Sequence, residues 1–404
     1  MVIFINNANV LKRRVNKNLK RFKSTLHLGY KIDSSILKKN QTVFSLIQPT
    51  GTMHLGNYLG AVSSWAELSK LKTDDSQKLI FGLADLHAIT NKHPKAQDFI
   101  DNKMDTLAHL IAFGVDPEKC CLYIQSDVKE HAELAWYLST ITNIGALARM
   151  TQWKSKSGQD ETIANNELST LQSEFSLGLF SYPVLQAADV LLYNPDFVPV
   201  GEDQTQHLEL TQTLARKFNH IYKSNVFKYP RIMTTPAKKI YSLKDVTKKM
   251  SKSDKSKVAS IYLSDSDEEI RLKIKKATTD SIVGEPFKFD PSKRPGVSNL
   301  INIVAGIQKK EISEVEKDME SLNSHSELKK YVSDVIVEWI AEPREKYKAI
   351  RQDTEYLKKV ALKGETEARK IASENMKKLE KQWASSSNVL LTKIYKLFLL
   401  ITFL

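Results

Sequence analysis

The 404-residue chain has only two cysteines, Cys120 and Cys121, which stand side by side in an apolar run. This arrangement offers neither a disulfide framework nor the ligand spacing of a metal site, so we expect buried, reduced thiols. Acidic residues are almost absent from the first 40 positions, where Asp33 is the single one. That region also lacks a long apolar run, which argues against a secretory signal.

Positive charge is concentrated at the same end. Residues 1–40 carry ten Lys or Arg and a net charge of +9, out of +13 for the whole chain. Basic, Ser, Asn and apolar residues with almost no acid are typical of a mitochondrial transit peptide. A disordered basic arm that binds RNA is the alternative. We favour the transit peptide, and with it a location in the mitochondrial matrix.

From residue 41 onward, short apolar runs alternate with amphipathic patterns. The predicted strands are Thr42–Ile47, Lys78–Ala84, Cys120–Gln125 and Asp196–Val200. The predicted helices between them include Asn57–Lys70, Asp98–Phe113 and Glu130–Leu138. This alternation predicts an α/β fold, a Rossmann-like doubly wound parallel sheet that binds ligands beyond the carboxyl ends of its strands.

The second half of the chain is helical and highly charged. Apolar residues recur at three- and four-residue spacing in Asp267–Thr278, Asn299–Gln308, Ile312–Leu322, Ser326–Trp339 and Glu365–Lys381. We expect a sheet domain at 41–235, a loop at 236–260 and an all-helical C-terminal domain at 261–385. Residues 158–174, which lack Lys and Arg, are predicted to be a surface insertion.

The tail at 386–404 is apolar but interrupted by Lys393 and Lys396. It is too short and broken to predict a membrane-spanning helix, so we expect no stable membrane insertion. Packing on the body, lying on a membrane surface and poor order remain open for it.

Two segments, about two hundred residues apart, carry patterns suited to phosphate. In the first, Gln48–Asn57, a strand ends in a turn and a helix begins, which presents backbone N–H groups and a dipole to an anion. Gly56 permits close approach, and His54 can donate a hydrogen bond. The second is the run Lys249–Ser253, whose ammonium groups can follow leaving phosphates. Taken singly, an ordinary turn and a solvated basic loop explain these segments as well.

A third segment, Ser181–Tyr193, is an apolar helical stretch with one acid, Asp189. A carboxylate in such surroundings is costly unless it is paired or hydrogen-bonded. A cap from a neighbouring helix or a Lys partner is the structural alternative to a role in binding.

Together the segments resemble the HIGH and KMSKS motifs of class I aminoacyl-tRNA synthetases. Over about residues 41–383, with the turn Gly201–Gln204, the chain is similar to the tryptophanyl-tRNA synthetases. The resemblance implies a ligase that activates L-tryptophan with ATP and transfers it to tRNA(Trp) in mitochondrial translation. It also implies Mg²⁺ accompanying ATP, an anticodon-reading helical domain and a homodimer.

The resemblance assigns roles to individual residues. The implied catalytic residues are His54, Asn57, Lys249 and Lys252. The implied ATP-binding residues are Gln48, Pro49, Thr50, Gly56, Asn57, Lys156, Gly201, Glu202, Asp203, Ile240, Lys249, Met250, Ser251, Lys252 and Ser253. The implied tryptophan-binding residues are Asp189, which would accept the indole N–H, and Phe44, His87, Tyr182, Gln186, Val198, Val200 and Gln204. No metal-ligating residue is expected.

Some alternatives stay open at this point. Lys156 and its neighbour Lys154 also fit a solvated loop, and Gln186 stands where bacterial tryptophan enzymes often have Met. A tyrosyl-tRNA synthetase, a small-molecule adenylyl- or nucleotidyltransferase and an inactive RNA-binding paralogue are the rival functions. The intact motif residues argue against the last of these.

Overall fold

The computed structural model describes residues 37–49, 51–90, 93–157, 175–201, 204–234, 239–252, 254, 256–282 and 284–402. Within these ranges, the side chains of 155–157, 234 and 384–402 are outside the description. The predicted arm up to residue 36 and the predicted insertion 158–174 also lie outside the described residues. Leu37, which the sequence grouped with the arm, is buried in a core of the sheet domain.

A parallel five-stranded sheet forms the centre of the fold, with strand order β3-β2-β1-β4-β5. Its strands are β1 (Thr42–Ile47), β2 (Lys78–Leu83), β3 (Cys121–Ile124), β4 (Phe197–Val200) and β5 (Arg231–Thr234). The predicted parallel sheet is confirmed, and β5 is an additional strand that the sequence prediction missed. The order of the strands reverses between β1 and β4, which is where doubly wound sheets bind ligands.

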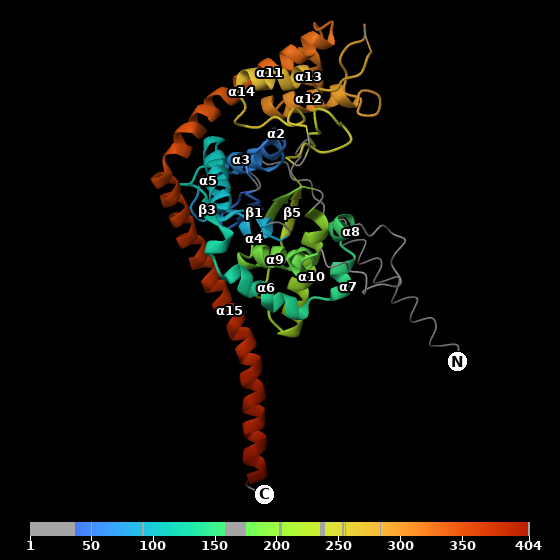
Figure 1. Cartoon of the computed structure of the whole chain (residues 1–404). Helices are drawn as coiled ribbons and strands as arrows, with labels where there is room; N and C mark the ends of the chain where they lie inside the picture. The colour runs from blue at the N-terminus through green and yellow to red at the C-terminus, as the bar shows by residue number, and fades with distance from the viewer. Residues whose placement is uncertain are drawn as a thin grey trace, which may run out of the picture.

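Helices cover both faces of this sheet (Figure 1). Val43 and Phe81 face one core, together with α3 (Ser63–Leu71) and α5 (Ala96–Ala112). Phe44 and Tyr123 face the opposite core, which is completed by α6 (Glu130–Ile141), α9 (Leu177–Leu192) and α10 (Thr205–Ile221). Because successive side chains of a strand point to opposite faces of the sheet, each strand contributes residues to both cores.

Short helical segments connect these elements at the ligand-binding edge. They are α2 (Leu55–Asn57), the π-helical turn η1 (Tyr58–Val62), α4 (Asp85–Ala88), the 3₁₀ turn η2 (Gln125–Asp127), α7 (Ile144–Ala148) and α8 (Thr151–Ser157). The helix predicted over Asn57–Lys70 is thus divided into α2, η1 and α3.

A group of helices follows Lys249–Ser253 in the chain: α11 (Asp267–Lys275), α12 (Pro295–Gln308), α13 (Ile312–Asp318) and α14 (His325–Gln352). The four lie at one end of the molecule in Figure 1. Helix α14 also packs on α5, where the ring of Tyr347 stacks on that of His109 with centroids 3.8 Å apart. The helical region is therefore joined to the sheet domain through a partly buried contact.

Helix α15 (Thr354–Thr402) runs beside edge strand β3 and then continues away from the body (Figure 1). Gly364 permits the contact, because a Cβ there would lie 1.6 Å from the carbonyl oxygen of Leu122. Ala368, Ala372 and Met376, four residues apart, are buried in the core behind the strand. The stretch predicted as a helix of the C-terminal domain, Glu365–Lys381, thus packs on the sheet and covers its edge.

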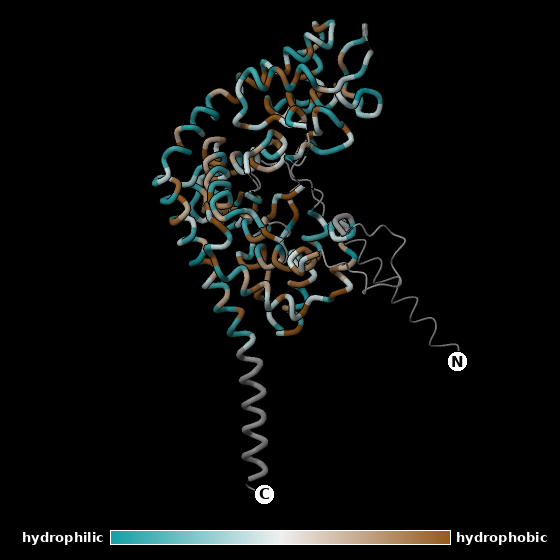
Figure 2. The backbone as a smooth tube through the Cα atoms, viewed as in Figure 1, coloured by the Kyte–Doolittle hydropathy of each residue, from teal (hydrophilic) through white to brown (hydrophobic). Residues whose placement is uncertain are grey.

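The predicted tail from residue 386 continues α15 without a break as far as Thr402. Figure 2 shows hydrophilic and hydrophobic stretches alternating along α15 beside the body, as expected for a helix with one buried face. Among the described helices, none combines the length and the apolar character needed to cross a membrane.

Candidate active site

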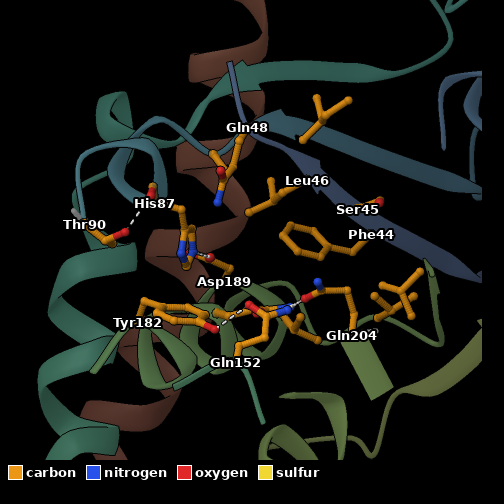
Figure 3. A pocket seen from close by; sticks show the side chains of 16 residues that line it. Phe44, Ser45, Leu46, Gln48, His87, Thr90, Gln152, Tyr182, Asp189 and Gln204 are labelled. Carbon is orange, nitrogen blue, oxygen red and sulfur yellow. Dashed lines mark hydrogen bonds and ion pairs between the residues drawn. The ribbon is translucent and has the colours of Figure 1, made fainter. Parts of the chain in front are cut away.

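A cavity of about 420 Å³ lies at the carboxyl ends of β1 and β4, close to the volume of other small-molecule sites. Figure 3 shows side chains from both strands and from α9 converging on it. The residues predicted to bind tryptophan all line this cavity: Phe44, His87, Tyr182, Gln186, Asp189, Val198, Val200 and Gln204. Gln48 lines it as well. The fold thus gathers them around one space, and their contact with tryptophan stays a prediction.

Asp189 lies at the inner wall of the cavity and is fully buried. His87 Nε2 lies 2.6 Å from its Oδ2, and His131 Nδ1 lies 2.7 Å from its Oδ1. The Gln125 amide also donates to Oδ1, at 2.7 Å. Burial raises the pKa of Asp189, but His87 and His131 outweigh it and lower the pKa to about 2. The carboxylate is therefore ionised at neutral pH, held by two imidazoles and an amide.

Another part of the cavity wall is polar but uncharged. The Tyr182 hydroxyl donates to Gln152 Oε1 at 2.7 Å, and Gln186 Nε2 donates to Gln204 Oε1 at 3.1 Å. Burial raises the pKa of Tyr182 to about 12, so the phenol keeps its proton. Figure 3 shows Tyr182 and Gln152 facing each other across this wall. Gln152 was not predicted, because the prediction for its segment rested on Lys154 and Lys156.

The two segments predicted to bind phosphate, Gln48–Asn57 and Lys249–Ser253, are neighbours in space and are called the phosphate-handling segments below. Leu55 N–H donates to the carbonyl of Ile261 at 2.8 Å, just beyond the second segment. A Cβ on Gly56 would lie 3.1 Å from the His54 ring and 3.5 Å from Met250 Cβ. Lys252 Nζ donates to the carbonyl of Gly51 at 2.5 Å. The fold therefore joins the segments into one site beside the cavity.

His54 and Asn57 bond to each other reciprocally. The Asn57 backbone N–H donates to His54 Nδ1 at 3.2 Å, and the His54 backbone N–H donates to Asn57 Oδ1 at 3.1 Å. Burial and the nearby Lys252 lower the pKa of His54 to about 4. A neutral imidazole that accepts at Nδ1 carries its proton on Nε2. His54 is thus prepared to donate one hydrogen bond to a ligand.

Lys252 is itself partly withdrawn from water. Burial lowers its pKa to about 8, although the carboxylate of Asp105 opposes this shift. The side chain is therefore mostly an ammonium at neutral pH and loses its charge in mildly alkaline solution. Lys249 differs, because it is exposed and its backbone pairs with that of Tyr241.

This titration predicts a pH effect on nucleotide use. The kcat/KM for ATP should fall as pH rises through about 8, because a neutral amine no longer attracts phosphate and kcat/KM follows the free enzyme. Steady-state rates between pH 6.5 and 9.5 would measure it. Lys252→Arg should remove the fall, since guanidinium stays charged throughout. An unchanged fall in Lys252→Arg would assign the titration to another group.

The remaining predicted ATP-binding residues lie around the joined segments. Pro49 and Ile240 are buried, and the Ile240 carbonyl accepts the Met250 N–H at 3.0 Å. Gly201 directly follows β4, and the Ser251 carbonyl accepts a hydrogen bond from the Ser260 hydroxyl at 3.1 Å. Thr50, Glu202, Asp203, Ser253 and the Lys156 side chain lie outside the description. The roles of all these residues stay predictions.

Comparisons with known proteins agree with this architecture. The family described as tRNA synthetases class I (W and Y) matches residues 37–341. The mitochondrial tryptophan–tRNA ligase of Saccharomyces cerevisiae is 48% identical over 365 residues, covering 90% of this chain and 96% of the yeast protein. This chain belongs to the tryptophanyl-tRNA synthetase family. Its Schizosaccharomyces pombe relative, also named mitochondrial, is 43% identical and covers 85% of this chain and 95% of its own.

Solved structures of tryptophanyl-tRNA synthetases share the fold. The enzyme from Mycoplasma pneumoniae superposes with a TM-score of 0.74 and 33% identity, covering 85% of this chain and 97% of its own. The enzyme from Campylobacter jejuni, solved with ADP and tryptophan, has a TM-score of 0.67 and 30% identity, covering 85% of this chain and all of its own.

Proposed function

We propose that this protein is a tryptophan–tRNA ligase that forms tryptophanyl-adenylate and then tryptophanyl-tRNA. The observation that carries the proposal is the buried, ionised Asp189 at the wall of the cavity beside the two joined phosphate-handling segments. Indole offers one N–H donor and no acceptor, so a carboxylate is a fitting reader for it. Phenylalanine has no such donor and would leave the carboxylate without a hydrogen bond from the ligand, so the binding of phenylalanine is disfavoured.

The chain's own residues act by positioning and by stabilising charge. In the first step a tryptophan carboxylate oxygen bonds to the α-phosphorus of ATP, and the bond to the β-phosphate oxygen breaks to release pyrophosphate. In the second step a hydroxyl of the terminal tRNA ribose attacks the acyl carbon, and AMP leaves. Neither step requires a protein nucleophile. We propose that His54 Nε2–H and the Lys252 ammonium, which lie close together, meet phosphate oxygens as negative charge shifts onto pyrophosphate.

Mg²⁺ enters this proposal with the nucleotide. The described residues contain no group of three or more His, Cys, Asp or Glu side chains placed to hold a metal ion. We therefore propose that ATP phosphates and water supply most of the ligands of Mg²⁺, as is common for this ion.

Transfer to tRNA provides the test of the whole proposal. Purified protein with labelled tryptophan, ATP and Mg²⁺ should form acid-precipitable tryptophanyl-tRNA on a tRNA(Trp) transcript. A tRNA(Tyr) transcript with labelled tyrosine is the control for the sister specificity. Activation without charging of any tRNA would instead support a small-molecule adenylyltransferase.

For recognition of the tRNA, we propose that the region of α11–α14 reads the anticodon by stacking on its bases and by contacts from basic side chains.

We propose that residues before Leu37 deliver the protein to the mitochondrial matrix. The Leu37 side chain is buried and its carbonyl accepts a short hydrogen bond from Gln77, so a protein beginning at Leu37 keeps these contacts. Residues 1–36 fused to a reporter should place it in the matrix, protected from added protease in intact mitochondria. A protein beginning at Leu37 should still charge tRNA in vitro. Activation that survives while tRNA affinity collapses would identify the arm as an RNA-binding element.

We propose that the active form is a homodimer. Trp136, Ile144 and Leu177 are 71%, 71% and 78% exposed. They lie on α6, α7 and α9, and both α6 and α7 pack on α9. A second copy would remove this apolar surface from water. Light scattering should give twice the mass of the chain, and Trp136→Glu with Ile144→Glu should reduce it to one copy.

A matched variant tests the location of that interface. Leu362, on α15, is 63% exposed, so Leu362→Glu adds the same charge at another exposed apolar site. It should leave the dimer intact. A fully active monomer in the unmodified protein would contradict the proposal.

A further inference from the structure

Behind the cavity, two buried residues that do not line it contact Asp189. Gln125 lies in η2 at the end of β3, and His131 lies in α6. Both are 0% exposed, and both bond to the same carboxylate oxygen, Oδ1, at 2.7 Å. Four elements thus meet at one carboxylate, because α9 carries Asp189 and α4 carries His87. Neither residue belongs to a motif that predicted a role for it.

The two carboxylate oxygens of Asp189 accept different numbers of hydrogen bonds. A carboxylate oxygen has about two lone-pair directions for hydrogen bonds. Oδ1 receives two donors, from Gln125 and His131, whereas Oδ2 receives one, from His87. Oδ2 is therefore the oxygen with capacity to accept a further N–H. In Figure 3 the His87 ring points at Asp189 from the cavity wall.

Each of the two residues is fixed by a second contact on its far side. Gln125 Oε1 accepts the Leu86 N–H at 3.2 Å, which sets the amide orientation and ties it to the segment carrying His87. His131 Nε2 lies 3.1 Å from the hydroxyls of Tyr123 and Tyr193. Burial raises the pKa of both phenols well above the usual value, so their O–H groups are present to donate. Because a carboxylate oxygen accepts, His131 Nδ1 donates to Asp189 Oδ1, and the two hydroxyls hold the ring from its Nε2 side.

We propose that Gln125 and His131 are positioning residues that hold Asp189 Oδ1 so that Oδ2 meets the indole N–H. They thereby set the preference of the enzyme for indole over rings of the same shape that lack the N–H. This inference rests on the proposed function and deepens it. Without one of the two donors the carboxylate can rotate about its Cβ–Cγ bond, and the geometry of its bond to the ligand is lost.

The test compares tryptophan with 3-(benzothiophen-3-yl)-L-alanine, in which sulfur replaces the indole N–H. Gln125→Met keeps the length of the side chain but removes the amide. It should lower the preference for tryptophan over the sulfur analogue about tenfold, the size of one lost hydrogen bond. The KM for ATP should not change. Dissociation constants from calorimetry and KM values from ATP–pyrophosphate exchange measure both ligands.

Gln212→Met is the matched control. Gln212 is also a buried glutamine of the sheet domain that donates one amide bond, to the Pro230 carbonyl at 2.8 Å, and it does not line the cavity. It should leave the preference at the wild-type value. If Gln125→Met weakens both ligands equally, or neither, the positioning role is refuted. Absence of tryptophan-dependent exchange in the wild type would instead refute the proposed function.

A second pair of variants, at His131, tests the same proposal if Gln125→Met does not fold. His131→Leu removes the donor, whereas the amide of His131→Asn can take the place of Nδ1–H. The preference for tryptophan should fall about tenfold in the first and return towards wild type in the second. Equal preferences in the two variants would overturn the proposal.

Discussion

Lys252→Ala is expected to lower the rate of tryptophan activation by roughly 10²–10³-fold, the usual effect of removing one charge-stabilising donor. Its ammonium bonds to the Gly51 carbonyl and is partly buried beside His54, so it stands where the two phosphate-handling segments meet. Because charge moves onto pyrophosphate in the transition state, kcat should fall much more than ATP binding weakens.

Pre-steady-state formation of the adenylate, with ATP varied, separates these two effects. Lys257→Ala is the control, because Lys257 is an exposed lysine shortly after Lys249–Ser253 in the chain. It should leave the rate close to wild type. If the Lys252→Ala enzyme activates tryptophan at nearly the normal rate, Lys249–Ser253 is only a solvated loop with no role in activation.

Asp189→Asn is expected to raise the KM for tryptophan and to lower the stability of the fold. Losing a hydrogen bond to a charged group costs about 1.5–3 kcal/mol, or roughly 10- to 150-fold in KM. The sequence alone suggested a specific effect on binding. In the structure the carboxylate already accepts bonds from His87, His131 and Gln125. An amide NH₂ would face at least one of these donors, which adds about 1–3 kcal/mol of destabilisation.

Thermal unfolding and KM values for tryptophan and ATP together measure the outcome. Asp280→Asn is a matched control, since Asp280 accepts bonds from Arg294 and His325 in the helical region away from the cavity. It should lower the melting temperature without changing the KM for tryptophan. If Asp189→Asn changes the melting temperature alone, Asp189 serves the fold and not the ligand.

The sequence predicted the parts of the fold that carry strong local signals. The strand Thr42–Ile47 has the predicted bounds, because five of its six residues are apolar or β-branched and a Pro-Thr-Gly turn follows closely. Strand β5, Arg231–Thr234, was missed because only Ile232 and Met233 in it are apolar, which is too short a run to give a strand pattern. The packing of α15 was also missed, because a stripe of small residues does not reveal whether a helix or a sheet lies opposite.

In the candidate site, too, some residues could be predicted from the sequence and others could not. Motif resemblance selected the residues that line the cavity, because a ligand constrains their types. Gln125, His131 and Gln152 carry no such motif, and their importance lies in bonds to residues far away in the chain: Gln125 reaches Asp189 across 64 positions. Only the packing of η2, α6 and α9 brings these partners together. The reciprocal bonds of His54 and Asn57 are local, and a polar pair three residues apart was a signal that could have predicted them.

Amino-acid-dependent ATP–pyrophosphate exchange tests the central claim most directly. The protein beginning at Leu37, supplied with ATP, Mg²⁺ and labelled pyrophosphate, should exchange label into ATP when L-tryptophan is added. L-tyrosine and L-phenylalanine at the same concentration should give no exchange above background, because neither places an N–H donor against Asp189. Exchange that depends on tyrosine, or that proceeds without any amino acid, would contradict the account.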